Sequence, residues 1–359
     1  MKSFIPILAT VAFALTGPVY AQENINLTIA SSHPTVVPWV GMIQTHFMGK
    51  TDDLLAETGN YKINWNEAFG GQLYKANATL SSVEDGITDI GWVFSFLEPA
   101  QLPLSQVSTS TPFAVTDVPA LLDVMEELFE SNEAFRKEWE DHNVTVLGLT
   151  ATDLYDIYSK IPINGIADIS GKKISAPGIL GTWLRGTGAN AVDGALTTFY
   201  TDIQTGVSDG VLSLALGVLP IKIHEVAPYI ARFDAAAAFS GAIAINTDVW
   251  NTLPEEVQTA MRQAGAYYTE SHGEAMVTDH NAALDHMVAL GADQNPPVSV
   301  TQMSTEERQK WVDALPNLAK EWADPLDARG IPAGEFLKQY MAGLRSKHVE
   351  PSRAWDEEL

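Results

Sequence analysis

The sequence of 359 residues contains no cysteine. This absence excludes thiol nucleophiles, thiolate metal sites and disulfides. We also expect no lipid anchor, because bacterial lipid anchors are attached to an N-terminal cysteine. A chain of this length buries enough surface to fold without cross-links. It suffices for two domains, since one domain takes about 150 residues.

Positive charge is also scarce. The chain has 21 lysine and arginine residues against 45 aspartate and glutamate residues, which gives a formal net charge of −24 at pH 7. Such an acidic surface repels nucleic acid and anionic membranes and favours solubility. We therefore expect no nucleic-acid partner. An anionic ligand remains compatible with this charge, because the local potential of a pocket can oppose the global one.

Long apolar runs are confined to the N-terminus. Residues 4–17 read FIPILATVAFALTG, follow the charge of Lys2 and precede the sequence VYA, in which small residues flank a tyrosine. This layout predicts a signal peptide at residues 1–21 and secretion to the periplasm of a Gram-negative bacterium. The run is shorter than the ~20 residues that span a bilayer. A buried N-terminal helix is the alternative interpretation.

The motifs of common hydrolases are missing. The chain has no Gly-x-Ser-x-Gly elbow, no His-Glu-x-x-His pair and no glycine-rich phosphate loop, and its eight histidines are scattered. We therefore expect no catalytic residue, no metal and no cofactor. A periplasmic hydrolase remains the alternative from the class of enzymes.

The N-terminal third of the mature chain alternates strand and helix patterns. Residues 25–30 and 61–65 are rich in β-formers, as are residues 89–94. Helix patterns cover residues 40–57 and 75–85 between them. Strands that alternate with helices of this size predict βαβ units and an α/β fold.

A short pattern occurs twice in the chain. Residues 86–89 read GITD and residues 206–209 read GVSD, and in both places a helix pattern precedes and an apolar strand follows. Each glycine suits the left-handed position that ends a helix. The repeat indicates two related α/β lobes. We also predict one long amphipathic helix at residues 119–139.

The order of these patterns predicts how the lobes share the chain. The first lobe is expected at residues 22–150 with parts of 232–270. The second is expected at residues 151–231 with parts of 271–359. A helix predicted at residues 254–290 is long enough to lie across both lobes.

Several segments carry a family resemblance, in order, from about Ile25 to Gly265. They read FGGQLY, VEDGITDIGW, TPFAVTD, GKKISAPG, WLRGTGAN, FYTDIQTGVSDG, HEVAPYI and INTDVWNTLPEEVQTAMRQAG. Together they resemble the DctP-type substrate-binding proteins of TRAP transporters. The resemblance implies a two-lobed periplasmic binding protein, type II-like, with an interlobe cleft, a hinge of crossing strands and a long helix along both lobes. It also implies a partner, a sodium-driven membrane permease of small and large subunits, and no catalysis.

One position departs from the family pattern. Family members place an arginine in a Lys-Ile-Arg-Val-Pro segment, where its planar fork grips the ligand carboxylate. This chain reads KISAP, with Ser175 at that place. Either the ligand lacks that carboxylate or other groups hold it. Lys75, His33, Arg185 and the backbone after Pro177 are the candidates.

Candidate ligand contacts come from loops at strand ends, from aromatic residues near the strands and from positions that match the family. They are Ser32, His33, Gln72, Trp92, Phe94, Tyr155, Ser175, Trp183, Ser213 and Asn246. The alternative for the aromatic residues is burial in the core, and for the loop residues simple exposure. The lost arginine and the available aromatics together favour an organic acid less charged than a dicarboxylate, with an aromatic or apolar monocarboxylate as the example. A ligand-sensing interaction protein is a further alternative.

Overall fold

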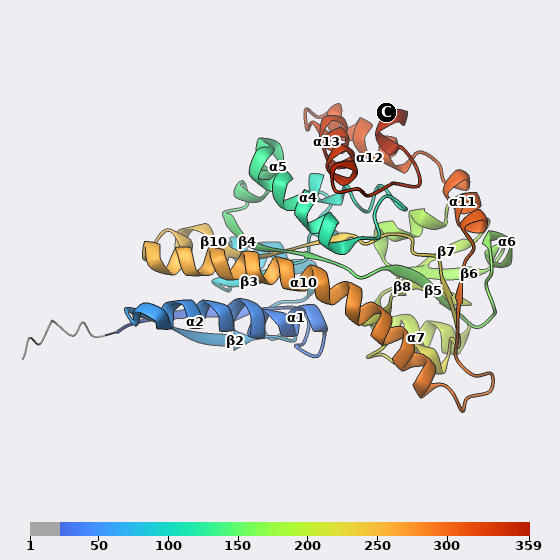
Figure 1. Ribbon diagram of the computed structural model, residues 1–359, viewed down its shortest axis with the longest axis horizontal. Coiled ribbons are helices and arrows are strands. Elements are labelled where there is room, and N and C mark those ends of the chain that lie inside the picture. Colours follow the sequence, from blue (N-terminus) through green and yellow to red (C-terminus); the bar gives the residue numbers. More distant parts are fainter. Residues whose placement is uncertain (1–21) are drawn as a thin grey trace, which may run out of the picture.

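The computed structural model describes residues 22–359, which form two lobes that each contain one mixed β-sheet (Figure 1). The predicted signal peptide, residues 1–21, lies outside the described residues. The sheet of the first lobe has the order β2-β1-β3-β10-β4. Its strands are β1 (Glu23–Ala30), β2 (Tyr61–Ala68), β3 (Ile90–Val93), β4 (Val144–Ala151) and β10 (Phe239–Asn246).

The sheet of the second lobe has the order β11-β9-β5-β8-β6-β7. Its strands are β5 (Tyr155–Ser159), β6 (Lys173–Ala176), β7 (Asn190–Asp193), β8 (Gly210–Leu214), β9 (Tyr229–Arg232) and β11 (Ser299–Gln302). In the first sheet β2, β1 and β3 are parallel at one edge, and β10 is antiparallel to both β3 and β4. In the second sheet the parallel groups β8-β6-β7 and β11-β9 lie at the two edges, and β5 is antiparallel to both groups. The predicted α/β class and two-lobed fold are therefore confirmed.

Helices cover both sheets. Those that belong to the first 150 residues are α1 (Pro38–Met42), the π-helical η1 (Ile43–Met48), α2 (Gly49–Thr58), α3 (Thr79–Glu84), α4 (Val118–Ser131), α5 (Glu133–Glu140) and the 3-10 turns η2 (Ala76–Ala78), η3 (Ser95–Leu97) and η4 (Leu104–Gln106). Those that follow are α6 (Ile166–Ile169), α7 (Leu196–Thr205), α8 (Ala215–Val218), α9 (Thr247–Trp250), α10 (Glu255–Leu290), α11 (Thr305–Ala314), α12 (Leu318–Asp327), α13 (Ala333–Ser346) and the 3-10 segments η5 (Gly178–Leu184), η6 (Ile223–Glu225) and η7 (Trp355–Glu358). No helix within residues 22–359 is both long and apolar enough to cross a membrane.

The prediction of one helix at residues 119–139 was wrong. The structure has two helices there, α4 and α5, separated at Asn132, whose backbone is extended. The Asn132 side chain accepts a hydrogen bond from the Phe135 N–H at 2.9 Å and so caps α5. Asparagine competes in this way with a continuous helix, because its side chain satisfies a free N–H at a helix start.

The repeated joint has the same construction in both lobes. Gly86 and Gly206 adopt positive φ, at 71° and 81°. The aspartate three residues later holds a neighbouring strand in each case: Asp89 accepts from the Thr28 N–H at 2.7 Å, and Asp209 accepts from the Lys173 N–H at 2.9 Å. These aspartates therefore fix strands, which explains why the pattern recurs.

The chain passes between the lobes along three routes. β4 continues through residues 152–154 into β5, and β9 continues through residues 233–238 into β10. The third route is α10, which runs in orange from the first lobe on the left to the second at lower right (Figure 1). It contacts β4, α2 and α4 of the first lobe and α8 and β11 of the second.

Candidate ligand-binding site

A cavity of about 240 Å³ lies between the lobes, where the crossing segments meet. This volume is somewhat below the usual range of small-molecule pockets, so the ligand should be compact. The lining residues come from both lobes and the crossings: His33, Trp39, Ala76, Trp92, Phe94, Phe96, Leu97, Ala151, Thr152, Tyr155, Pro177, Ala195, Leu196, Thr197, Phe199, Ser213, Leu214 and Ser240.

Three stacked rings form the wall from the first lobe. Trp92 and Phe94 have ring centroids 5.0 Å apart at an interplanar angle of 19°, and Phe94 and Phe96 are 5.5 Å apart at 23°. Trp92 lies near the end of β3 and Phe94 directly after it, where alternate residues share a face, and the 3-10 turn η3 adds Phe96. Such a wall suits a flat ligand that stacks on its faces.

His33 stands edge-on to this wall. Its ring centroid lies 5.4 Å from that of Trp92 and 6.1 Å from that of Phe94, at angles of 81° and 88°. Its Nδ1 lies 2.9 Å from Ser32 Oγ. Burial lowers the pKa of the His33 imidazole below its usual value, so the ring is neutral near pH 7.

The wall from the second lobe is less aromatic. Phe199 and Ser213 contribute to it, together with the start of α7 at residues 195–197. Tyr155 lies at the crossing and packs edge-on against Trp183, with centroids 5.5 Å apart. Burial raises the pKa of the Tyr155 hydroxyl, so it stays protonated at physiological pH.

The lining contains six aromatic residues and, within the described chain, no lysine, arginine, aspartate or glutamate. Of the cationic candidates, Lys75 donates to the Gly71 carbonyl at 2.8 Å, and Arg185 pairs with Glu321 on the surface. Among the described lining residues, His33 is thus the side chain that can take up a proton and become positively charged. A ligand carboxylate cannot be gripped here by an arginine fork.

Five of the ten predicted contact residues line this cavity: His33, Trp92, Phe94, Tyr155 and Ser213. The other five lie outside its lining. Ser32 supports the His33 ring, and exposed Gln72 donates to the Phe69 carbonyl at 2.9 Å.

The remaining three predicted residues are buried or form hydrogen bonds outside the cavity lining. Ser175 is fully buried within its sheet. Trp183 is a core residue whose Nε1 donates to the Thr109 carbonyl at 2.7 Å. Asn246 caps α9, since its side chain accepts from two N–H groups there and donates to two carbonyls near the end of α3. None of these three residues belongs to the candidate site.

Sequence reasoning left several lining residues out of the site. Phe96 follows Trp92 and Phe94 at the same two-residue spacing, but that spacing is equally typical of a buried core strand. Trp39 and Phe199 are buried residues on helical segments, where a core position is the ordinary expectation. Their place at the cavity depends on how the two lobes face each other.

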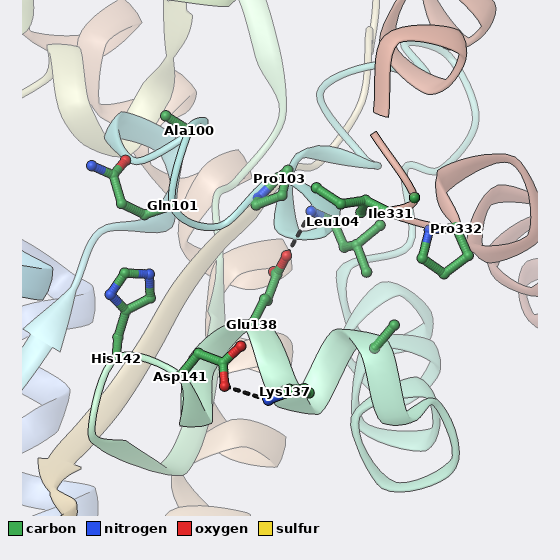
Figure 2. A pocket seen from close by; sticks show the side chains of 12 residues that line it. Ala100, Gln101, Pro103, Leu104, Lys137, Glu138, Asp141, His142, Ile331 and Pro332 are labelled. Atoms are coloured by element: carbon green, nitrogen blue, oxygen red, sulfur yellow. Dashed lines mark hydrogen bonds and ion pairs between the residues drawn. The ribbon is translucent and has the colours of Figure 1, made fainter. Parts of the chain in front are cut away.

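A second concavity, of about 380 Å³, lies on the outer side of the first lobe (Figure 2). Figure 2 shows Glu138 in its centre, directed at the segment that begins with Leu104. The carboxylate accepts from the Leu104 and Ser105 N–H groups at 2.7 and 2.9 Å and from Ser105 Oγ at 2.6 Å. Burial raises the pKa of Glu138 to about 8, against the effect of these hydrogen bonds. Because this acid is occupied in holding a turn, the concavity is not our candidate site.

Replacing Glu138 with alanine is expected to destabilise the protein by about 2 kcal/mol, because two backbone N–H groups lose their acceptor. Glu138→Gln keeps one carbonyl oxygen and should lose less than half as much. Urea unfolding midpoints measure both changes. Equal losses for the two variants would show that the hydrogen bonds are not the cause.

Comparison with known proteins agrees with this geometry. Residues 44–324 match the model of the bacterial extracellular solute-binding proteins, family 7. The chain is 22% identical to the ectoine-binding periplasmic protein of Halomonas elongata over 285 residues, 78% of this chain and 80% of the relative. It is 23% identical to the C4-dicarboxylate-binding periplasmic protein of Rhodobacter capsulatus over 291 residues, 79% of this chain and 84% of the relative.

The fold is shared with a TRAP solute-binding protein from Rhodoferax ferrireducens solved with copurified benzoate. The two structures superpose with a TM-score of 0.76, and their sequences are 18% identical. The alignment covers 91% of this chain and 100% of the Rhodoferax protein. These relatives are solute-binding proteins, not enzymes, so the hydrolase alternative is set aside. The chain belongs to the bacterial extracellular solute-binding proteins of family 7, the DctP-type binding proteins of TRAP transporters.

Proposed function

We propose that this protein captures a small, flat organic acid with a single carboxylate in the periplasm. It then delivers the acid to a TRAP permease of small and large membrane subunits. The observation that carries the proposal is the interlobe cavity, which has six aromatic lining residues and, in the described chain, no lysine, arginine, aspartate or glutamate. Secretion by the signal peptide at residues 1–21 belongs to the same proposal.

The energetics of the cavity favour an apolar ligand body. Burial of apolar surface contributes about 25 cal/mol per Å², and stacked rings add about 0.5–1.5 kcal/mol per pair. A dicarboxylate would bring a second charge into a cavity whose lining has no arginine or lysine to pair with it. An unpaired buried charge is strongly unfavourable.

The relatives show that this fold accommodates different ligands. By their names, one binds ectoine and one C4-dicarboxylates, and the Rhodoferax structure holds benzoate. At 18–23% identity these ligands do not transfer to this chain. The benzoate example supports the proposal, because a flat monocarboxylate is the class that an aromatic cavity favours.

A thermal-shift screen of residues 22–359 tests the ligand class. We expect aromatic monocarboxylates such as benzoate to raise the melting temperature, since a ligand at 100 times its Kd adds roughly 2.7 kcal/mol of stability. Succinate, malate and sugar acids should give no shift. Strong shifts with dicarboxylates and none with monocarboxylates would contradict the proposal.

Two variants locate the binding event. Phe94→Ala removes the middle ring of the stacked wall and should weaken binding at least tenfold. Gln72→Ala is the matched control, because this exposed side chain lies outside the cavity lining. A loss of affinity in both variants, or in neither, would place the site elsewhere.

A further inference from the structure

We infer that a cross-cleft anion site replaces the missing arginine. It consists of the first N–H groups of α7 from the second lobe and the imidazole of His33 from the first, and His33 takes up a proton when the carboxylate binds. This inference rests on the proposed function and names how that site holds its ligand.

The start of α7 presents free donors to the cavity. Its cap residue, Ala195, has no side-chain acceptor, and the N–H groups of Leu196 and Thr197 donate to no acceptor in residues 22–359. Both residues line the cavity. The next two N–H groups already bond to the Ala195 carbonyl. A ten-residue helix directs its positive dipole end and its free N–H groups at an anion placed there.

One buried side chain of the lining has no polar partner within residues 22–359. Trp39 is 8% exposed, and its indole Nε1 is buried without an acceptor. An indole N–H only donates, so its partner must be an acceptor. Unpaired buried polar groups are rare in folded proteins, and a ligand carboxylate at this wall would give the indole N–H the acceptor that it lacks.

His33 supplies the charge. Its Nδ1 faces Ser32 Oγ at 2.9 Å, which leaves Nε2 for a ligand. Because burial lowers its pKa, the imidazole is neutral in the empty protein. A carboxylate beside it favours the protonated ring, which then donates from both nitrogens, and charge-assisted hydrogen bonds of this kind are the strong ones.

Few other charges reach this imidazole. β3 and the residue after it place Trp92 and Phe94 against it, which do not titrate. The loop after β2 carries Lys75, bound to the Gly71 carbonyl, and the crossing to the second lobe carries Tyr155, which stays protonated. Since the raised pKa of Tyr155 keeps its hydroxyl neutral, we assign the protonation change on binding to His33.

Proton uptake by His33 makes the affinity for the carboxylate depend on pH. The pKa of His33 is expected to be lower in the free protein than in the complex. At pH values between these two pKa values, the complex binds up to one proton more than the free protein. Affinity for the carboxylate should therefore rise up to tenfold for each unit by which the pH falls through that interval. A neutral ligand would show no such dependence.

Titration calorimetry with benzoate at pH 7.5, in phosphate and in Tris, measures the protons exchanged. We expect uptake of about one proton in the wild-type protein and none in His33→Gln, whose affinity should also lose its rise toward pH 6. Tight benzoate binding without proton uptake would overturn this inference and keep the proposed function. If the wild-type protein bound no benzoate at pH 7.5 or at pH 6, both this inference and the proposed function would be overturned.

The α7 donors have their own test. Leu196→Pro removes one N–H at the first helical position, where proline fits and where the preceding Ala195 is already extended. Leu196→Ala is the matched control for loss of the side chain. We expect the proline variant to bind benzoate about tenfold more weakly than the alanine variant. Equal affinities, with both variants folded by circular dichroism, would remove α7 from the site.

Discussion

Replacing Asp156 with alanine is expected to lower the free energy of unfolding at pH 8 by about 3–5 kcal/mol, as breaking a buried ion pair does. Asp156 and Asp153 are 0% exposed and His280 is 1% exposed. His280 Nδ1 lies 3.0 Å from Asp153 Oδ2, and its Nε2 lies 3.6 Å from Asp156 Oδ2. Asp156→Ala would remove one of the two carboxylates beside the His280 imidazole. It would also remove the acceptor shared by the Phe233 and Asp234 N–H groups.

This cluster joins the parts of the molecule that meet at the hinge. Asp153 lies in the crossing between β4 and β5 and also accepts from the Leu216 N–H at the start of α8. His280 lies on α10, the helix common to both lobes. Asp156 belongs to β5 and holds the start of the second crossing at residues 233–234. The loss of one acid therefore loosens the contact of α10 with both crossings.

The same cluster predicts a pH dependence of stability. Burial raises the pKa of Asp156 from its usual 3.8 to about 7. For His280, burial opposes protonation, but the hydrogen bond and charge of Asp153 raise its pKa overall. Both folded-state values exceed the unfolded ones, so the folded protein binds more protons. The stabilisation is full below the unfolded values and is lost as the pH rises through about 7 for Asp156 and through the folded pKa for His280.

Urea unfolding at pH 5 and pH 8 measures these effects. Asp156→Ala should be destabilised at both values. Asp156→Asn keeps an acceptor oxygen and carries no charge. Its free energy of unfolding should therefore increase relative to that of the wild type by about 1 kcal/mol per pH unit as the pH rises from 5 to 7. An identical pH dependence in the wild type and Asp156→Asn would show that this carboxyl does not titrate in that range.

Local signals in the sequence were sufficient for the framework of the fold. Gly86 and Gly206 ended helices as predicted, because a positive φ suits glycine and the pattern around them repeats. The long helix was predicted at residues 254–290 and found at Glu255–Leu290. Short exposed strands such as β7 and β11 escaped prediction, since they have little apolar alternation.

The site was predictable only in part, because it is assembled from segments far apart in the chain. His33 was predicted because it follows a strand in a loop, and Trp92 because it lies on a strand. Both predictions needed only the neighbouring sequence. Asn246 followed the family pattern, yet in this structure its amide is fully used in capping α9. Trp39 and the start of α7 reach the cavity through the packing of one lobe against the other, which no local pattern encodes.

At its closest approach to the first sheet, α10 meets β4 through backbone atoms. At Gly265 the helix touches β4 so closely that an added Cβ would lie 1.8 Å from the Leu147 carbonyl oxygen. Gly148 faces it, and a Cβ there would lie 2.8 Å from the Gly265 carbonyl oxygen. One turn further on, Thr269 Oγ1 accepts from the Leu149 N–H at 2.9 Å and holds the helix at this distance.

Gly265→Ala is therefore expected to lower the free energy of unfolding by about 3 kcal/mol or more, because the helix must move off the sheet to make room. Gly49→Ala is the matched control: this glycine also lies in a helix, but its added Cβ would meet only the Gln44 carbonyl oxygen, at 3.6 Å. There the same substitution should raise stability by about 1 kcal/mol, since alanine favours the helix. Chemical unfolding of both variants gives the comparison. Since α10 is packed on both lobes, a Gly265 variant that stayed as stable as the wild type would mean that helix and sheet separate easily, and a rigid α10 could then no longer be assumed when the lobes close.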